Sequence, residues 1–103
     1  MANESIEGLR WAKKRSPEKM AAFHGLLREI KKEGVLSEKT KELIFVALSV
    51  KSQCEYCIDH HVKQAIEMGL TEDEILEAAW VAVGMGGGPA LAYMGLVKKA
   101  LNN

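Results

Sequence analysis

The sequence of 103 residues lacks several features that would assign a protein to a class at once. It has no net charge, because fourteen basic residues balance fourteen acidic ones, so its charge does not indicate nucleic acid or an anionic membrane as a partner. No unbroken apolar run is longer than residues 43–48, far below the roughly 20 residues of a membrane-spanning helix. The N-terminal segment also has no apolar stretch of signal-peptide length. We therefore expect a cytoplasmic protein with no nucleic-acid or membrane partner.

Cysteine is scarce, and both cysteines lie in one short segment, QCEYCIDHH, together with two of the three histidines. Lasting structural disulfides are uncommon in the cytosol, so the spacing Cys54-x-x-Cys57 favours a redox, catalytic or metal-binding role. Zinc would use both cysteines and one of His60 or His61, but a structural zinc site normally needs four ligands. Neighbouring residues on a helix point about 100° apart, so the two histidines could hardly both join. We therefore expect no metal and no cofactor.

Proline is rare too, and both prolines stand where helices begin. Ser16 with Pro17 forms one predicted helix start, and Ser37 forms another. Thr71 opens a capping-box pattern, and Pro89 fits the first turn of a last helix that ends near residue 101. With apolar residues at helical spacing between these signals, the sequence predicts an all-α fold of five or six helices in a single domain, residues 1–103.

Glycine is concentrated at residues 84–88, where a phosphate-binding loop is one interpretation. Such loops follow a strand, and the P-loop type is followed by Lys-Ser/Thr. Here a helix precedes the cluster and Pro89-Ala90-Leu91 follows it. The cluster therefore predicts a tight turn between two helices, with close approach of the backbone.

Two expected helices, around residues 43–50 and 78–85, are apolar on nearly every face. Such a helix needs to be covered all round, and a domain of this size has little interior for two of them. We therefore expect a homo-oligomer, in which neighbouring subunits cover part of this surface.

The helix expected over residues 53–69 gives conflicting indications for the two thiols. Cys54 lies at its start, where the helix dipole and unpaired N–H groups favour a thiolate. Cys57 and His61 are spaced i, i+4 on one face, so the imidazole can take the proton of Cys57. The residues alone leave open which thiol is activated. His60 is expected on a solvated face.

An acidic residue in the preceding helix completes the candidate site. Glu42 and His61 lie equally far along the chain from the junction of Lys51 and Ser52. If the two helices form an antiparallel hairpin that turns there, the carboxylate faces the imidazole. A carboxylate in that place would orient the ring and stabilise its charged form.

The pattern Glu42-x11-Cys54-x2-Cys57-x3-His61 resembles the signature of the alkylhydroperoxidase AhpD-like proteins of the carboxymuconolactone decarboxylase family. The resemblance covers about residues 39–101 and includes the glycine cluster in the family's order. It implies an AhpD-like helical fold whose members form trimers or hexamers.

The resemblance also implies a peroxidase cycle. Cys57 would attack a hydroperoxide substrate and become a sulfenic acid, with His61 and Glu42 as the proton relay. Cys54 would then form the Cys54–Cys57 disulfide, which a dithiol electron donor reduces. These four residues are the expected catalytic site.

Two other functions are compatible with the same residues. Lactone decarboxylation, the chemistry that names the family, would use His61 and Glu42 and needs no cysteine pair. A redox-sensing or metal-binding oligomeric module would use the cysteines without turnover. His24 is expected to be structural, because it lies in another helix among Ala and Leu.

Overall fold

The computed structural model describes the backbone of residues 3–103, and the side chains of residues 4–103. These residues form seven helical segments and no strand, and one of the seven is a single turn. The prediction of an all-α fold is confirmed. The segments are α1 (Asn3–Arg15), α2 (Pro17–Lys31), α3 (Glu38–Lys51), α4 (Glu55–Glu67), α5 (Glu72–Gly86), α6 (Gly88–Leu91) and α7 (Met94–Asn102).

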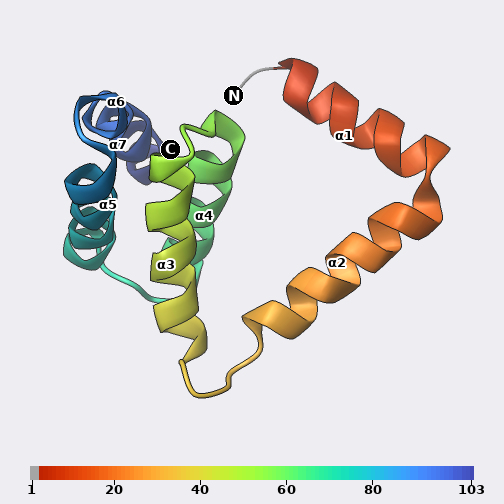
Figure 1. The fold of residues 1–103 in the computed structure, drawn as a ribbon, viewed down its shortest axis with the longest axis horizontal. Coiled ribbons are helices and arrows are strands. Elements are labelled where there is room, and N and C mark those ends of the chain that lie inside the picture. Colours follow the sequence, from red (N-terminus) through yellow and green to blue (C-terminus); the bar gives the residue numbers. More distant parts are fainter. Residues whose placement is uncertain (1–2) are drawn as a thin grey trace.

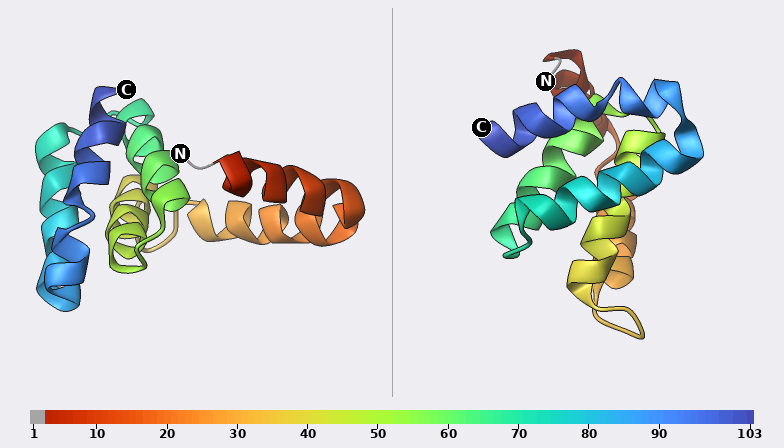
Figure 2. Two further views of the ribbon diagram at one scale, coloured as in Figure 1. Left: turned by 90° about the horizontal axis from the view of Figure 1, so that it is seen from above. Right: turned by 90° about the vertical axis from the view of Figure 1, so that its left-hand side faces the viewer.

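The helices divide into two parts, which we call the arm and the bundle. The arm is the hairpin of α1 and α2, and the bundle is formed by α3 to α7 (Figure 1). Figure 2 shows the arm projecting from the bundle. The Lys41 ammonium of α3 donates to the carbonyl of Ile30, 2.7 Å away, near the end of α2. This bond joins the end of α2 to the bundle.

The core lies entirely within the bundle. Helix α4 buries Ile58, Val62 and Ala65 at spacings of four and three residues, so one stripe of the helix is apolar. This stripe packs among buried side chains of α3, α5 and α7, and α2 buries none. The other buried apolar residues are Val46, Val50, Leu70, Ile75, Ala79, Ala82, Ala90, Val97 and Ala100.

The helix predicted around residues 43–50 is present, but only part of it is buried within the chain. Val46 and Val50 are fully buried, whereas Leu48 is 55% exposed. The helix predicted around residues 78–85 is similar, since Ala79 is buried and Trp80 is 51% exposed. Both helices thus present an apolar face that this chain does not cover.

Side-chain caps stabilise the starts of α3 and α5. Ser37 accepts a hydrogen bond from the backbone N–H of Thr40, as the sequence predicts. Thr71 and Glu74 form both bonds of the capping box at the start of α5. Ser16 stands at the predicted start of α2 but makes no side-chain cap bond. Local signals thus locate all three helix starts.

The glycine cluster forms the predicted turn between helices. Gly87 has φ +66°, a left-handed conformation that L side chains rarely adopt. A Cβ on Gly86 would meet the Cβ of Ala90 at 2.8 Å. The single last helix expected after Pro89 is instead divided into α6 and α7, because Tyr93 donates three residues back to the Ala90 carbonyl and interrupts the α-helical ladder. No helix in the described part of the chain is both long and apolar enough to cross a membrane.

Candidate active site

The site is built where α3 turns back into α4 (Figure 1). Gln53 makes the reversal in the left-handed region, with φ 54°, and its side chain donates to the Pro89 carbonyl at 3.2 Å. Cys54 follows as the N-cap residue of α4. The hairpin that the sequence predicts is therefore present, and its turn holds the first cysteine at the helix start.

Cys54 and Cys57 are joined by a disulfide, with their Cα atoms 5.2 Å apart. Both residues are half-buried. The Cys54 sulfur also accepts a hydrogen bond from the backbone N–H of Cys57 at 3.2 Å, which caps α4. This bond and the positive end of the helix dipole both favour negative charge on Cys54.

Glu42 and His61 meet across the hairpin, as equal spacing from the turn predicts. The Oε2 atom of Glu42 lies 2.6 Å from Nδ1 of His61. Glu42 is only 3% exposed and the His61 side chain 13%, so each polar group is buried with a partner. When the Nδ1–H group donates to the carboxylate, the lone pair of neutral His61 stands on Nε2. The pair thus leaves Nε2 as the ring nitrogen that can accept a proton.

Phe45 also belongs to the site, although the sequence reasoning did not include it. Its ring stacks on the His61 imidazole with centroids 4.6 Å apart and planes only 3° from parallel. The Lys31 ammonium of α2 lies 5.7 Å from the centroid of the phenyl ring. One signal could have revealed Phe45, since it follows Glu42 by three residues and so lies on the same face of α3.

His60 points to another face of α4, as predicted. It stacks on Tyr56, with ring centroids 6.2 Å apart, and meets His61 only edge-on. Burial lowers the pKa of His60, and the nearby His61 and Lys31 act in the same direction. His60 is therefore a neighbour of the Glu42–His61 pair that meets it only at a ring edge.

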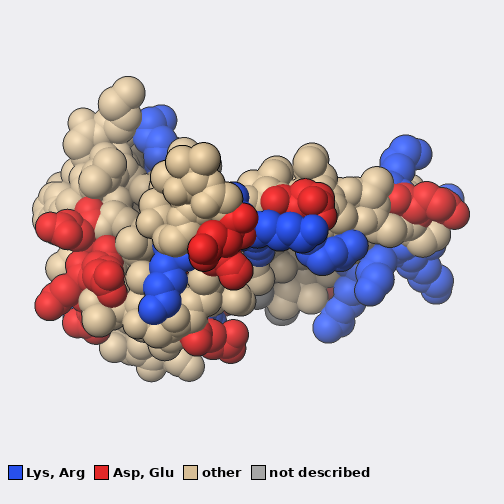
Figure 3. All heavy atoms as spheres, turned by 90° about the horizontal axis from the view of Figure 1, so that it is seen from below, with Lys and Arg blue, Asp and Glu red and all other residues tan. Residues whose placement is uncertain are grey.

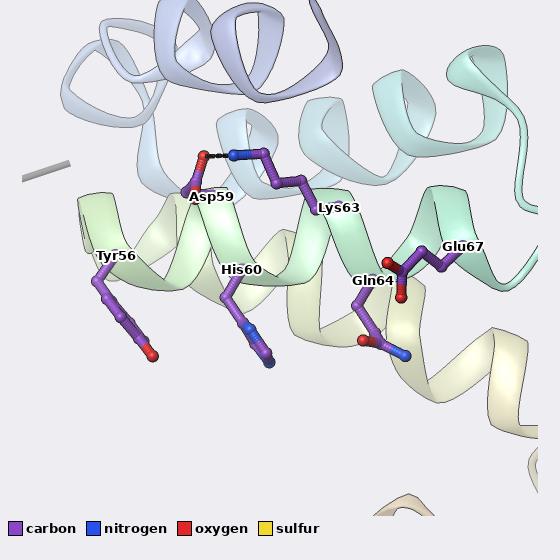
Figure 4. Close-up of a pocket in the computed structure, with 6 residues that line it drawn as sticks. All are labelled: Tyr56, Asp59, His60, Lys63, Gln64 and Glu67. Carbon is purple, nitrogen blue, oxygen red and sulfur yellow. Dashed lines mark ion pairs between the residues drawn. The ribbon is translucent and has the colours of Figure 1, made fainter. Parts of the chain in front are cut away.

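A shallow cavity of about 210 Å³ lies on this outer face of α4 (Figure 4). Tyr56, His60 and Gln64 point to the same side of the helix in that view. Asp59 is paired with Lys63 at 2.8 Å. The described residues contain no group of three or more His, Cys, Asp or Glu side chains that could hold a metal ion. His24 lies on the arm beside Phe23.

Comparison with known proteins identifies the family. Residues 17–98 match the model of the carboxymuconolactone decarboxylase family. The chain belongs to the carboxymuconolactone decarboxylase family. The match includes α2 and all the residues of the site described above, and it leaves out α1 and the end of α7.

Similar proteins in this family have known sequences or structures. The chain is 43% identical over 72 residues to "Uncharacterized protein 4 in cox locus" of Paracoccus denitrificans, covering 70% of this chain and 65% of that protein. It is 36% identical over 77 residues to "Uncharacterized protein H16_B0147" of Cupriavidus necator, covering 75% and 68%. The chain thus spans about two thirds of the length of these relatives.

Solved structures in the family have the same fold. The carboxymuconolactone decarboxylase family protein lpg0406 of Legionella pneumophila is 38% identical with a TM-score of 0.88, covering 96% of this chain and 88% of its own. TM1620 of Thermotoga maritima is 25% identical with a TM-score of 0.78, over the same shares of the two chains. It is described as "possibly involved in antioxidative response". The helical fold is therefore the family's fold.

Proposed function

We propose that this protein is a thiol-dependent peroxidase of the alkyl hydroperoxide reductase type, similar to the AhpD-like members of its family. The observation that carries the proposal is the Cys54–Cys57 disulfide one helical turn before His61, whose ring is paired with buried Glu42. A redox-active disulfide needs two thiols that can close and reopen without rearranging the chain. An adjacent base oriented by a third group is the usual means of activating a thiol nucleophile. The antioxidative description of TM1620 is in agreement with this function.

The first step oxidises Cys57. His61 takes the thiol proton on Nε2, and Glu42 stabilises the imidazolium that forms. The Cys57 thiolate attacks the terminal oxygen of the hydroperoxide, the O–O bond breaks, and a sulfenic acid remains on Cys57. The proton returns from His61 to the leaving oxygen, which departs as alcohol or, from hydrogen peroxide, as water.

The second half of the cycle restores the dithiol. The Cys54 thiol attacks the sulfenic sulfur of Cys57, which forms the disulfide and releases water. A dithiol donor then reduces the disulfide through a mixed disulfide and is itself oxidised. The position of Cys54 at the N-cap supports this role, because a lower thiol pKa makes Cys54 a better leaving group during reduction.

Peroxide consumption by the dithiol-reduced protein tests the proposal. Cys57→Ser is expected to abolish turnover, whereas Cys54→Ser is expected to stop after one turnover with a sulfenic acid that dimedone traps. One equivalent of hydroperoxide is expected to remove two thiols per chain without joining chains covalently. Turnover at the normal rate by Cys57→Ser would contradict the assignment of the attacking thiol.

The same measurements separate the other functions. A lactone decarboxylase that uses His61 and Glu42 would keep its activity when both cysteines are replaced. A metal-binding module would purify with stoichiometric zinc, and its bound thiolates would not be free to attack peroxide.

A further inference from the structure

Phe45 lies flat against the ring that acts as the base in the proposed cycle. The phenyl and imidazole planes are 3° from parallel, with centroids 4.6 Å apart. Glu42 and Phe45 come from the same face of α3, one helical turn apart. The same helix therefore supplies a hydrogen-bond partner for one edge of His61 and a flat surface for one face of it.

The hydrogen bond to Glu42 alone does not fix the plane of the imidazole. A single Nδ1–H···O bond allows the ring to rotate about the axis of that bond. Such a rotation changes the direction in which the Nε2 lone pair points. A parallel ring in contact with one face prevents this rotation, because turning would drive the imidazole edge into the phenyl carbons. Phe45 is half-buried on a core helix, and its ring already lies parallel to the imidazole.

We propose that Phe45 is a positioning residue for His61, holding the plane of the imidazole and stabilising its protonated form through the face of the phenyl ring. That His61 serves as the base for Cys57 rests on the proposed peroxidase function. The effect of Phe45 on the orientation and proton affinity of His61 does not depend on that function. The face of an aromatic ring carries negative potential and attracts a cation above it. His61 becomes such a cation each time it accepts the proton of Cys57.

Several charged groups lie around this stack. Glu42 of α3 pairs with the imidazole at 2.6 Å, and Asp59 of α4 acts on the neighbouring His60. Lys31, at the end of α2, lies 5.7 Å from the phenyl centroid and opposes protonation. His60 meets His61 edge-on with centroids 4.9 Å apart. A test of Phe45 must therefore leave all of these groups in place.

The first experiment follows the ring of His61 by NMR as a function of pH in the oxidised protein. Phe45→Leu keeps an apolar side chain but removes the aromatic face. It is expected to lower the proton affinity of His61 by about two- to tenfold. Phe45→Tyr keeps the face and is expected to titrate like the parent. Phe45→Trp presents a ring that binds cations more strongly and is expected to shift the titration the other way.

The second experiment measures the alkylation rate of Cys57 by iodoacetamide against pH, in a Cys54→Ser background that leaves one thiol. Phe45→Leu is expected to slow alkylation at neutral pH by about two- to tenfold, and Phe45→Tyr to restore it. Phe23→Leu is the matched control, since it makes the same change at the other phenylalanine, on the arm. It is expected to leave both His61 and Cys57 unchanged.

The outcomes separate this inference from the proposed function. A His61 titration that is the same in the parent, Phe45→Leu and Phe45→Trp would overturn the role of Phe45, whether or not peroxide is consumed. Because the NMR measurement needs no turnover, a shifted titration supports the effect on His61 even if the protein reduces no hydroperoxide. If Phe45→Leu does not fold, the opposite shift expected for Phe45→Trp decides the question.

Discussion

The arm and the bundle are both helical, yet only one of them is held by a core. Helix α2 buries no residue, and Phe23 on its surface is 55% exposed. The bundle helices bury Ile58, Ile75 and Val46 completely. The arm helices therefore form from local signals, whereas the bundle is also stabilised by packing. Local sequence signals are thus enough to make α2 a helix, but no core contact within the chain fixes the position of this helix relative to the bundle.

The two parts also differ in charge. Lys and Arg side chains gather along the arm in the view of Figure 3, and acidic ones gather on the bundle. The last turn of α1 carries Lys13, Lys14 and Arg15, and the first turn of α5 carries three acidic residues. Opposite charges of this kind favour association between copies of the chain.

An apolar groove of about 560 Å³ lies between α3 and α5 of the bundle. Leu43, Ile44 and Val81 line it, and Glu74 and Glu77 lie among its lining residues. The arm exposes apolar side chains such as Trp11 and Phe23, and basic side chains lie beside them. The arm of a second copy of the chain would therefore complement a groove that is apolar with acidic residues in its lining. We propose that further copies of the chain cover these surfaces, in a trimer or hexamer as the resemblance implies.

The largest expected contrast between the two parts concerns the site. Glu42→Gln removes the charge that stabilises the His61 imidazolium, and it is expected to lower peroxide turnover by about 100- to 10,000-fold. Glu29→Gln makes the same change on the arm, where the carboxylate is exposed and paired with Lys32. It is expected to leave turnover within about twofold of the parent. Equal losses in steady-state assays would contradict the location of the chemistry in the bundle.

Core packing gives the next contrast. Ile58→Ala empties a fully buried position and is expected to lower the free energy of unfolding by about 2–5 kcal/mol. Ile30→Ala on the arm changes a side chain that is 45% exposed in the single chain. Its expected cost is below about 1 kcal/mol at high dilution, measured by urea unfolding.

Protein concentration sharpens this test. If copies cover the arm, the cost of Ile30→Ala rises with concentration, because assembly then contributes to stability. The cost of Ile58→Ala is expected to change much less. A concentration-independent effect at Ile30 would argue that the arm stays uncovered.

The assembly itself is tested through the most exposed aromatic residue of the arm. Trp11 is 66% exposed, and tryptophan is enriched among residues that dominate interfaces. Trp11→Ala is expected to weaken association by about 2 kcal/mol, measured by light scattering over a dilution series. Glu7→Ala, one turn earlier in α1, is the control. A parent protein with the mass of one chain would contradict the proposed oligomer.

The smallest contrast concerns helix caps. Thr71→Ala removes the hydroxyl that accepts from the backbone N–H of Glu74, while the Thr71 backbone N–H can still donate to the Glu74 carboxylate. The loss is expected to cost about 1 kcal/mol in thermal or urea unfolding. Ser16→Ala on the arm is expected to cost only a few tenths, because Ser16 makes no side-chain cap bond. Similar costs at both positions would contradict this difference between the caps.

The pH dependence of stability gives a further test of the capping box. Hydrogen bonds with Thr71 lower the pKa of Glu74, so the stabilisation that its carboxylate gives is complete above the unfolded pKa. It is lost as the pH falls through the lower pKa of the folded state. Thr71→Ala keeps the backbone bond, which is the larger cause, but it removes the side-chain bond to the Glu74 carboxylate. The cost of the substitution should therefore be somewhat smaller in acid than at neutral pH.

Much of the site could be predicted because its residues lie on two helices joined by one turn. Equal spacing from the junction of Lys51 and Ser52 was enough to predict that Glu42 and His61 meet. Phe45 was not predicted, because an aromatic residue inside an apolar run looks like any core residue. The arm was not predicted either, since its helical signals are local and give no information on what the helix packs against.

The division of the last helix shows a similar limit. Pro89 correctly indicated a helix start, but the i→i+3 bond from Tyr93 to Ala90 depends on how that segment packs. Neither the composition nor the hydrophobic periodicity of the sequence indicates such a bond, so the break between α6 and α7 could not be predicted.

The sulfur of Cys54 takes part in two interactions. It forms the disulfide with Cys57, and it caps α4 by accepting a hydrogen bond from the Cys57 N–H. In the proposed cycle the bond between the sulfurs opens and closes, but the bond from the Cys57 N–H has an acceptor in every state. A thiolate would accept it more strongly than a disulfide sulfur. In the proposed cycle, the first turn of α4 therefore keeps its cap whether the two sulfurs are joined or apart.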